Sequence, residues 1–262
     1  MKSAEILKRL VQLSHELGRE DRQLAILGEG NVSADLGDGT FYVKASGQQL
    51  ATIDSDGFTR VKMSPILAAL EDPGKTDDQI REVLETCRVD KKAGLPSVET
   101  FLHVVCLKEG GAKFVGHTHP VSVLKILCSK LGAGPFCRHI FPDAIVVCGR
   151  HLAVVPYVDP GIRLAMALRK SLRDFLLGHN GPPKVILMVN HGPVVLGQTE
   201  REVLNLMLML DKWASILAGN YTGGGPQFLE EKTADRIENR PDEHYRRRAI
   251  GKLKKTSNTQ PG

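Results

Sequence analysis

The sequence predicts an α/β fold in one domain, in which amphipathic helices alternate with short apolar strands. Apolar residues recur at helical spacing in residues 3–18 and 199–217, which predicts helices with one face on a core. Residues 184–190 are mostly apolar, as a buried strand is. Neither an internal repeat nor a long linker divides the 262 residues, and a fold of this size buries roughly 70–75% of the surface of its unfolded chain.

The positive charge of the chain is concentrated near its C-terminus. The formal net charge is +5, but six of the 35 Lys and Arg residues follow the last acidic residue, so residues 1–245 carry 29 basic and 30 acidic side chains. We therefore expect no nucleic-acid partner. Residues 1–240 are predicted to form the domain, and residues 241–262 a basic, flexible tail.

Cysteine usage and hydropathy favour a cytoplasmic protein. The five cysteines are odd in number, widely spaced and mostly in apolar surroundings, which suits small core residues better than disulfides and indicates a reducing compartment. Residues 1–20 intersperse charges among apolar residues, unlike a signal peptide, and no run reaches 18 apolar residues. We expect neither export nor a membrane partner.

A hairpin with an Asp-Gly turn is expected after the first helix. If Asp38 and Gly39 are the two loop residues, Asn31 lies opposite Ser46, with Gly47 beside them. Backbone N–H groups and small polar side chains in such a turn can bind a phosphate or carboxylate, although from the hairpin alone an ordinary turn rich in glycine and serine is the favoured interpretation. The segment matches neither the dinucleotide nor the triphosphate fingerprint.

Further strands and helices follow along the chain. The predicted strands are residues 58–62, 113–119, 144–148, 152–155 and 184–190. The predicted helices are residues 65–70, 77–87, 97–108, 121–131, 162–177, 199–217 and 230–238, with an irregular portion beginning at Tyr221. Ser97 is a candidate N-cap, which puts Glu99 in the first turn, where a glutamate usually complements the helix dipole. One turn later, His103 is expected to pack or hydrogen-bond within the fold rather than bind metal.

Three histidines stand at the ends of predicted strands. His117 and His119 are two residues apart, so in a strand through residues 113–119 both side chains point to the same face. His191 follows the last predicted strand and precedes Gly192, where the backbone can bend sharply. Imidazole is a common ligand of zinc and similar ions, and a catalytic zinc site usually takes three protein ligands. The first two histidines alone can be ordinary structural residues, but with the third the pattern predicts a metal site.

Six motifs, in order, resemble those of the class II aldolase/adducin family, with its L-fuculose-phosphate aldolase-like members. They are Gly-Asn-Val-Ser at 30–33, Ala-Ser-Gly at 45–47, Pro-Ser-Val-Glu at 96–99, His-Thr-His-Pro at 117–120, the Pro-Tyr to Pro-Gly loop at 156–161, and Asn-His-Gly at 190–192. The resemblance covers about residues 5–220. Residues 236–246 also resemble the aldolase half of bifunctional rhamnulose-phosphate aldolase/dehydrogenase proteins, whose dehydrogenase half has no counterpart in this sequence.

The resemblance implies a three-layer α/β/α sandwich around a predominantly antiparallel sheet, assembled as a homotetramer with active sites near subunit interfaces. The implied ligands of Zn²⁺, or of another divalent transition metal, are His117, His119 and His191. The implied phosphate-binding residues are Asn31, Ser46, Gly47 and Ser97. Glu99 is implied to be the acid/base. Where the family has a second serine this chain has Val98, so one hydroxyl for the phosphate is missing, and whether the substrate is phosphorylated stays open.

An aldolase reaction is consistent with these residues. Cleaving a carbon–carbon bond beside a ketone leaves an enediolate, whose oxygen a zinc ion stabilises, and a carboxylate with a tuned pKa can move the protons. We therefore expect a zinc-dependent class II aldolase, a carbon–carbon lyase acting on a ketose phosphate or a related hydroxy-ketone. Tyr157 and Tyr221 are the candidates for the general acid, with Asp143 or His139 of a neighbouring subunit as further options.

Other reactions use the same kind of site. Sugar-phosphate 4-epimerases, dehydratases and decarboxylases of this scaffold mostly rely on a metal-stabilised enolate, so the metal site cannot separate them. A non-catalytic adducin-like domain is the alternative of a different class, and it predicts loss of the metal histidines. This chain keeps all three together with Glu99, which favours an enzyme. Glu29 and Asp159 also lie in or beside the motifs, but neither occupies the position of the acid/base.

Overall fold

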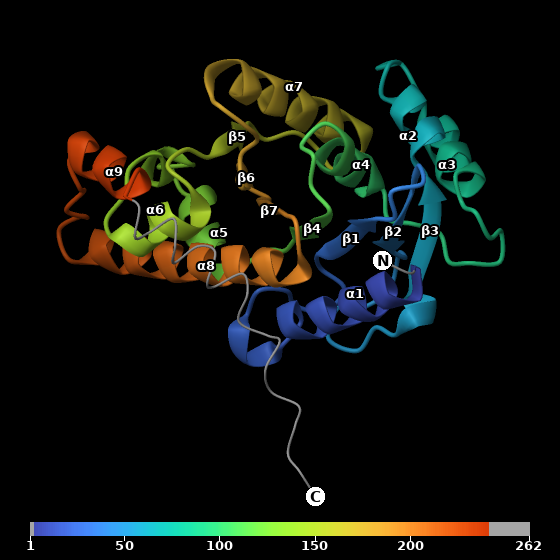
Figure 1. Ribbon diagram of the computed structural model, residues 1–262, viewed down its shortest axis with the longest axis horizontal. Helices are drawn as coiled ribbons and strands as arrows, with labels where there is room; N and C mark the ends of the chain where they lie inside the picture. The colour runs from blue at the N-terminus through green and yellow to red at the C-terminus, as the bar shows by residue number, and fades with distance from the viewer. Residues whose placement is uncertain (1–2, 241–262) are drawn as a thin grey trace, which may run out of the picture.

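A seven-stranded sheet forms the middle of the molecule (Figure 1). The computed structural model describes residues 3–240, so the predicted basic tail, residues 241–262, lies outside the described residues. The strands are β1 (Asn31–Asp35), β2 (Thr40–Lys44), β3 (Phe58–Lys62), β4 (Phe114–His117), β5 (Ala153–Val155), β6 (Val185–Met188) and β7 (Gly192–Gly197). Their order is β3-β2-β1-β4-β7-β6-β5, and every neighbouring pair is antiparallel except the parallel pair β5 and β6. The predicted predominantly antiparallel sheet is confirmed.

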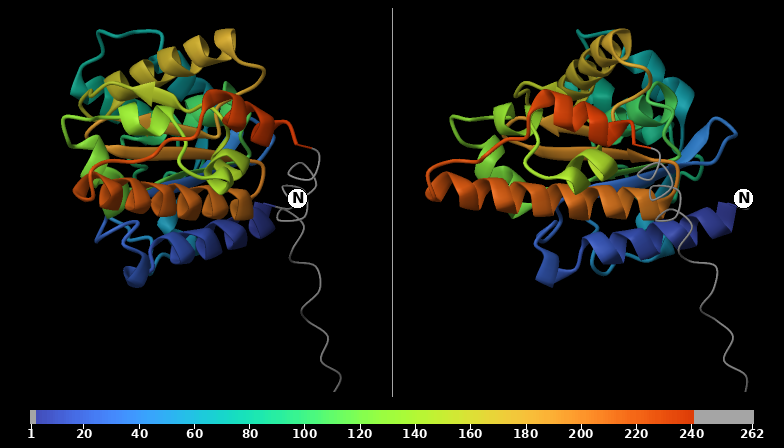
Figure 2. Two further views of the ribbon diagram at one scale, coloured as in Figure 1. Left: turned by 90° about the vertical axis from the view of Figure 1, so that its left-hand side faces the viewer. Right: turned by 60° about the vertical axis from the view of Figure 1, so that its left-hand side comes forward.

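Helices pack on both faces of this sheet (Figure 2). They are α1 (Ser3–Leu17), α2 (Met63–Ala69), α3 (Asp77–Thr86), α4 (Thr100–Lys108), α5 (Val121–Leu127), α6 (Pro142–Cys148), α7 (Ile162–Gly178), α8 (Glu200–Thr222) and α9 (Glu231–Glu238). Short 3-10 helices occur at Glu20–Arg22, Ser55–Gly57 and Gly134–Cys137. One face is covered by α1, α5, α6 and α8, and the other by α2, α3, α4 and α7. The three-layer α/β/α arrangement is therefore confirmed.

Alternation of side chains along the strands builds a separate core on each face. In β6, Val185 and Leu187 belong to the cluster beneath α8, whereas Ile186 and Met188 belong to the cluster beneath α7. All four side chains are fully buried. A strand that is covered on both faces is apolar at every position, and this continuous apolar run is why β6 could be predicted from the sequence.

Three element predictions were wrong. Residues 144–148, predicted as a strand, lie in α6. Pro142 stands in the first turn of that helix, where proline is favoured, and a short buried apolar run fits either a strand or a helix. The strand β7 was missed because its first residues, Gly192 and Pro193, were interpreted only as a turn. Tyr221 lies in the last turn of α8 and does not begin an irregular portion.

The hairpin of β1 and β2 has a register that differs by one residue from the predicted one. Its loop comprises residues 37–39, where two residues were predicted, so every pairing shifts by one. A shift of one residue turns a side chain to the other face of the sheet. The predicted pairing of Asn31 with Ser46 is wrong, and Asn31 is instead paired with His117 of β4.

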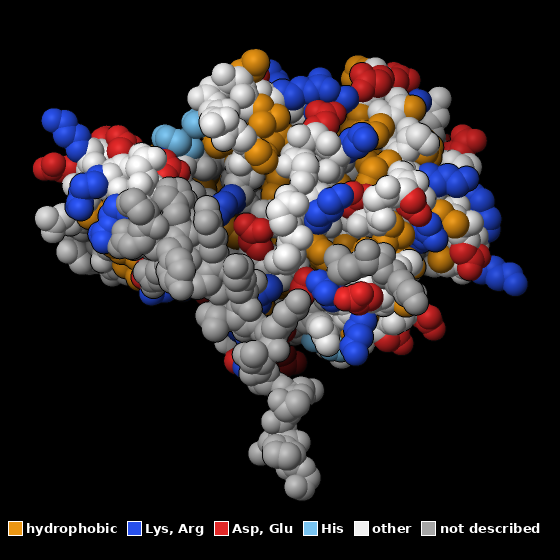
Figure 3. All heavy atoms as spheres, in the orientation of Figure 1, with side chains coloured by type: hydrophobic (Ala, Val, Ile, Leu, Met, Phe, Trp, Pro, Cys, Tyr) orange, Lys and Arg blue, Asp and Glu red, His pale blue; other side chains and the backbone are white. Residues whose placement is uncertain are grey.

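The surface mixes charges of both signs over the described residues. On the face in Figure 3, the Lys and Arg side chains lie interspersed with Asp and Glu. No helix in residues 3–240 combines the length and the apolar character that a membrane crossing requires. The five cysteines are free thiols, but Cys128 and Cys137 are exposed, so only three of them are core residues.

Candidate metal centre

The ends of the central strands bring three histidines together. His117 is the last residue of β4, and His191 lies in the turn between β6 and β7. His119 lies beyond the end of β4, so the predicted strand through residue 119 is too long, and simple alternation does not place this side chain. The ligand nitrogens of the three histidines nevertheless all lie within 4.8 Å of one another. The structure thus places the three sequence-predicted histidines in one cluster.

The three imidazole rings face one another edge-on. Their centroids are 4.8 Å apart for His117 and His119, and 5.0 Å apart for each of these with His191. The interplanar angles are 65°, 80° and 72°. Nε2 of His117 lies 3.0 Å from Nε2 of His119. Converging imidazole nitrogens are a donor set that zinc and neighbouring divalent ions accept.

A hydrogen bond fixes which nitrogen of His117 can bind a metal. Nδ1 of this fully buried ring lies 2.9 Å from the carbonyl oxygen of Pro193. A carbonyl only accepts, so Nδ1 donates to it, and Nε2, which faces the other histidines, is the nitrogen that can bind a metal once it has lost its proton. Metal-bound histidines usually donate their second N–H in this way, and the residues present therefore fit a divalent ion.

Two glycines allow the backbone to pass close to the histidines. A Cβ on Gly192, whose φ is +150°, would lie 2.6 Å from the carbonyl oxygen of Thr118 and 3.1 Å from Cδ2 of His119. A Cβ on Gly30, whose φ is +70°, would lie 2.7 Å from the carbonyl oxygen of His117. Any other residue at these two positions would displace the segment that carries the ligands.

Contacts outside the cluster anchor the segment after β4. The backbone N–H of His119 donates to the carbonyl oxygen of Leu24 at 2.9 Å, and the hydroxyl of Thr118 donates to Sδ of Met207 on α8 at 3.1 Å. On its other side, Nδ1 of His119 lies 3.9 Å from Oε1 of Glu29. These contacts explain how a histidine outside the strand still faces its neighbour.

Glu99 directs its carboxylate into the histidine cluster. Its Oε1 lies 3.0 Å from Nε2 of His191 and 3.5 Å from Nε2 of His117. Glu99 is itself the N-cap of α4, so the prediction of Ser97 as the cap was wrong; the Ser97 hydroxyl accepts the N–H of Glu99 at 3.3 Å. Burial by itself would raise the pKa of Glu99, but the charges and hydrogen bonds of the two histidines outweigh it and hold this pKa well below its usual value. We call the three histidines and Glu99 the metal centre.

Asn31 lies directly behind Glu99. Its Nδ2 donates to Oε2 of Glu99 at 2.5 Å, and its Oδ1 is hydrogen-bonded to Nε2 of His103. Nδ1 of His103 lies 2.7 Å from the hydroxyl of Ser33. Burial lowers the pKa of His103 to about 3, which keeps the ring neutral. The expectation that His103 hydrogen-bonds within the fold is confirmed, whereas Asn31 contacts the acid/base candidate instead of Ser46.

The other predicted phosphate-binding residues lie on two neighbouring backbone segments. The N–H of Ser46 donates to the carbonyl oxygen of Leu95 at 2.8 Å, which brings Ser46 and Gly47 beside the segment of Ser97. Ser46 and Gly47 are exposed, and Ser97 is half-buried. Val98 is 46% exposed, and its apolar side chain offers no hydroxyl to a ligand at this position.

A buried lysine near this site was missed by the sequence analysis. Lys44, the last residue of β2, is only 3% exposed. Its Nζ donates to the carbonyl oxygens of Gly28 at 3.1 Å and Gln48 at 2.6 Å, and so joins the loops before and after the hairpin. Burial lowers its pKa, while the negative charge of Glu99 acts in the opposite direction. The sequence does carry a signal for it, because a lysine within a predicted strand, immediately before Ala-Ser-Gly, is a candidate for a buried charge beside the site.

The candidates for the general acid lie apart from the metal centre. Tyr157 is 57% exposed, and its hydroxyl donates to Oδ1 of Asp159 at 2.9 Å, which raises the tyrosine pKa. Tyr221 is 37% exposed. Within residues 3–240, neither tyrosine hydrogen-bonds to the metal centre. His139 is 2% exposed and stacks on Trp213, so it is not accessible to a neighbouring subunit.

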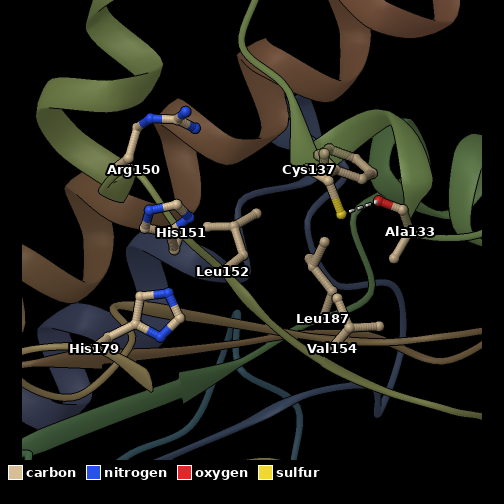
Figure 4. A pocket seen from close by; sticks show the side chains of 9 residues that line it. Ala133, Cys137, Arg150, His151, Leu152, Val154, His179 and Leu187 are labelled. Atoms are coloured by element: carbon tan, nitrogen blue, oxygen red, sulfur yellow. Dashed lines mark hydrogen bonds between the residues drawn. The ribbon is translucent and has the colours of Figure 1, made fainter. Parts of the chain in front are cut away.

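A hollow away from the metal centre is lined by none of the residues of that centre (Figure 4). The rings of His151 and His179 face it, with centroids 4.7 Å apart. Arg150 also lines it, but its guanidinium is bound to Glu231 and Asp235 of α9. The positive charge of this hollow is therefore already neutralised by the fold.

Comparisons with known proteins agree with the fold and the motifs. Residues 8–218 match the family described as "Class II Aldolase and Adducin N-terminal domain". The solved N-terminal class II aldolase domain of a conserved protein from Thermoplasma acidophilum is 28% identical, with a TM-score of 0.67 over 82% of this chain and 95% of that one. The chain is thus similar to this domain over most of its length.

Two curated relatives carry different functional names. The uncharacterized oxidoreductase YuxG of Bacillus subtilis is 29% identical over 74% of this chain, but the match spans only 27% of its own length. The 3-oxo-tetronate 4-phosphate decarboxylase of Pectobacterium atrosepticum is 26% identical over 72% of this chain and 73% of its own. The similarity therefore identifies a shared domain more securely than a shared reaction.

Proposed function

The chain belongs to the class II aldolase and adducin family, and from this premise we propose that it is a metal-dependent carbon–carbon lyase that cleaves a ketose phosphate or a related hydroxy-ketone through an enediolate. The observation that carries the proposal is the position of Glu99, whose Oε1 lies 3.0 and 3.5 Å from Nε2 of His191 and His117. A carboxylate at the point where three imidazoles converge can exchange protons with a substrate held there.

Each residue of the metal centre has a role in this proposal. The three histidines would hold Zn²⁺ or another divalent transition metal. When bound, such an ion supplies positive charge that polarises a carbonyl and stabilises an enediolate. Glu99 takes a proton from a substrate hydroxyl as the carbon–carbon bond breaks and delivers one to the enediolate carbon. Its side chain is 12% exposed, which limits competition from water.

Substrate binding is assigned to the exposed side of the site. Ser46, Gly47 and Ser97 lie on adjacent segments and would bind an anionic group of the substrate through a hydroxyl and backbone N–H groups. The buried cation of Lys44, which is bound to the carbonyl oxygens of Gly28 and Gln48, would favour a negatively charged ligand near this loop. Tyr157 and Tyr221 are exposed and are proposed, from a neighbouring subunit of a homotetramer, as general acids that protonate the aldehyde oxygen in the bond-forming direction; in cleavage the same group would receive the proton of the hydroxyl that becomes the aldehyde.

Decarboxylation is the second candidate function. The 3-oxo-tetronate 4-phosphate decarboxylase relative supports it, since loss of carbon dioxide beside a ketone leaves the same kind of enediolate as aldol cleavage. No feature of the site favours a 4-epimerase or a dehydratase over these two. A non-catalytic adducin-like role fits less well, because the three histidines and Glu99 are all in place.

The test is a substrate panel with identification of the products. It contains ketose 1-phosphates, ketose 5-phosphates and unphosphorylated 3-oxo acids, incubated with the protein reconstituted with Zn²⁺. The proposal expects an aldehyde and a smaller ketone, whereas carbon dioxide would identify the decarboxylase. An epimer or a dehydrated product without bond cleavage would contradict a carbon–carbon lyase.

Location and assembly form a further part of the proposal. We propose a cytoplasmic homotetramer that acts on a small molecule. The exposed tyrosines support an assembled site, because the described part of one chain leaves both without a contact to the metal centre. Light scattering of the purified protein measures the oligomeric state, and a monomer would contradict a shared site.

A further inference from the structure

Three buried side chains, those of Ser33, His103 and Asn31, form a hydrogen-bonded chain that ends on Glu99. We infer that this chain is a positioning device: it holds Oε2 of Glu99 and thereby keeps Oε1 turned toward the histidines. The inference rests on the proposed function for the role of Glu99. It also gives Asn31 a task other than binding a phosphate.

The direction of each hydrogen bond follows from the carboxylate at the end of the chain. An ionised carboxylate only accepts, so Asn31 presents Nδ2 to Oε2 of Glu99. Oδ1 of Asn31 then faces His103, and because a carbonyl only accepts, Nε2 of His103 carries the proton. Nδ1 of His103 is left as an acceptor, and the Ser33 hydroxyl donates to it. This assignment gives each of the three bonds one donor and one acceptor.

The hydrogen-bonded side chains are buried, so water cannot easily replace one of them. Ser33 and His103 are fully buried, and Asn31 is 2% exposed. Water therefore has little access to take over a lost hydrogen bond, and a buried polar group without a partner is costly. If the N–H donor of His103 were removed, the Asn31 side-chain amide could rotate. Its oxygen would then face the Glu99 carboxylate, and because both groups are acceptors the hydrogen bond to Glu99 would be lost.

The chain connects two elements that carry the site. Glu99 and His103 are four residues apart at the start of α4, and Asn31 and Ser33 lie on one face of β1. Asn31 is also paired with His117 across β1 and β4. The position of the Glu99 carboxylate relative to the histidines is thus set by side chains linking the helix to the sheet. Catalytic groups need such support because small displacements reduce rates strongly.

Two substitutions of His103 separate positioning from simple packing. In His103→Leu the donor to Asn31 is lost, and we expect kcat to fall by roughly 10- to 100-fold, the usual effect of losing an outer-shell partner. KM and the metal content should stay near their wild-type values, because the substrate residues and the three ligands are unchanged. In His103→Gln the amide nitrogen can replace Nε2 as donor, so most of kcat should return.

A serine pair supplies a matched test at the far end of the chain. We expect Ser33→Ala to lower kcat by a few-fold, since His103 then loses the partner that orients its ring. Ser14→Ala is the control, because Ser14 is also fully buried but its hydroxyl has no partner within the described residues. The control should keep wild-type activity and stability. If His103→Leu does not fold, the comparison of Ser33→Ala with Ser14→Ala still tests whether the hydrogen-bonded side chains position Glu99.

The tautomer of His103 gives a readout that does not depend on turnover. Nitrogen-15 NMR of the full-length protein should find the proton on Nε2 and an acceptor at Nδ1, and Ser33→Ala should shift the Nδ1 signal. A proton on Nδ1, an unchanged kcat in His103→Leu, or equal losses in the Leu and Gln variants would each overturn the inference. If the wild type cleaves no substrate, the proposed function fails, and the tautomer alone still decides whether the chain has the inferred direction.

Discussion

The metal centre and the segments proposed to bind the substrate anion are adjacent but differ in organisation. In the metal centre, a buried carbonyl orients His117, and Asn31 holds one oxygen of Glu99. In the anion-binding segments, Ser46 is exposed and Val98 is 46% exposed. The three histidines and Glu99 are thus positioned within one chain, whereas the proposed recognition of the substrate depends on surface residues and on whatever packs against them. This difference explains why the residues indicate an intermediate more clearly than a substrate.

The largest effect should come from removing a buried ligand. We expect His117→Ala to weaken metal binding by more than about 100-fold, beyond what the loss of an outer partner costs, and to abolish turnover with it. Metal analysis after dialysis measures the first effect. His179→Ala, an exposed histidine outside the centre, is the control and should keep its metal. Full metal content in His117→Ala would show that the cluster is not the binding site.

Glu99→Gln tests whether chemistry and metal binding can be separated within the centre. The amide keeps the shape of the side chain but cannot take up a proton, so we expect turnover to fall by roughly 10²- to 10⁴-fold. The metal should remain, because the three histidines are unchanged. Activity comparable to that of the wild type would mean that another residue moves the proton.

Ser46→Ala tests the exposed region, where a smaller effect is expected. Loss of one hydrogen bond to an anion should raise KM for a phosphorylated substrate by roughly 5- to 10-fold while kcat changes little. Ser55→Ala, at an exposed serine of the 3-10 helix before β3, serves as the control. An unchanged KM would remove Ser46 from the anion site.

Val98→Ser tests the same region in the opposite direction. The substitution adds the hydroxyl that the family motif has and this chain lacks, so KM for a phosphorylated substrate should fall by about 2- to 5-fold. The effect is expected to be small because the position is already open to water. A higher KM would place the phosphate elsewhere and favour an unphosphorylated substrate.

The sequence predicted those parts of the site that depend on residue identity. The three histidines were proposed as a cluster because each stands at or near the end of a predicted strand, whereas Glu99 was proposed because the resemblance to the class II aldolase/adducin family implied it. The full burial of His117, and the clash that a Cβ on Gly192 would cause, agree with a metal cluster at these strand ends. The buried strand β6 was found because a continuous apolar run has few alternatives.

What the sequence did not predict depends on pairing between distant segments. The contact of Asn31 with Glu99 was not predicted, because the predicted hairpin register was off by one residue, and such a shift turns a side chain to the other face of the sheet. Lys44 was missed because its partners, the carbonyl oxygens of Gly28 and Gln48, are defined only by the folded loops. Residues 144–148 were predicted as a strand because a short apolar run has no distinguishing period.

The metal content of the purified chain tests the central claim most directly. After reconstitution with Zn²⁺ and removal of loosely bound ions, elemental mass spectrometry should find one divalent ion per chain, and His191→Ala should lose it. A wild-type protein that holds no divalent metal after reconstitution would contradict the account of this site as a metal-dependent lyase centre.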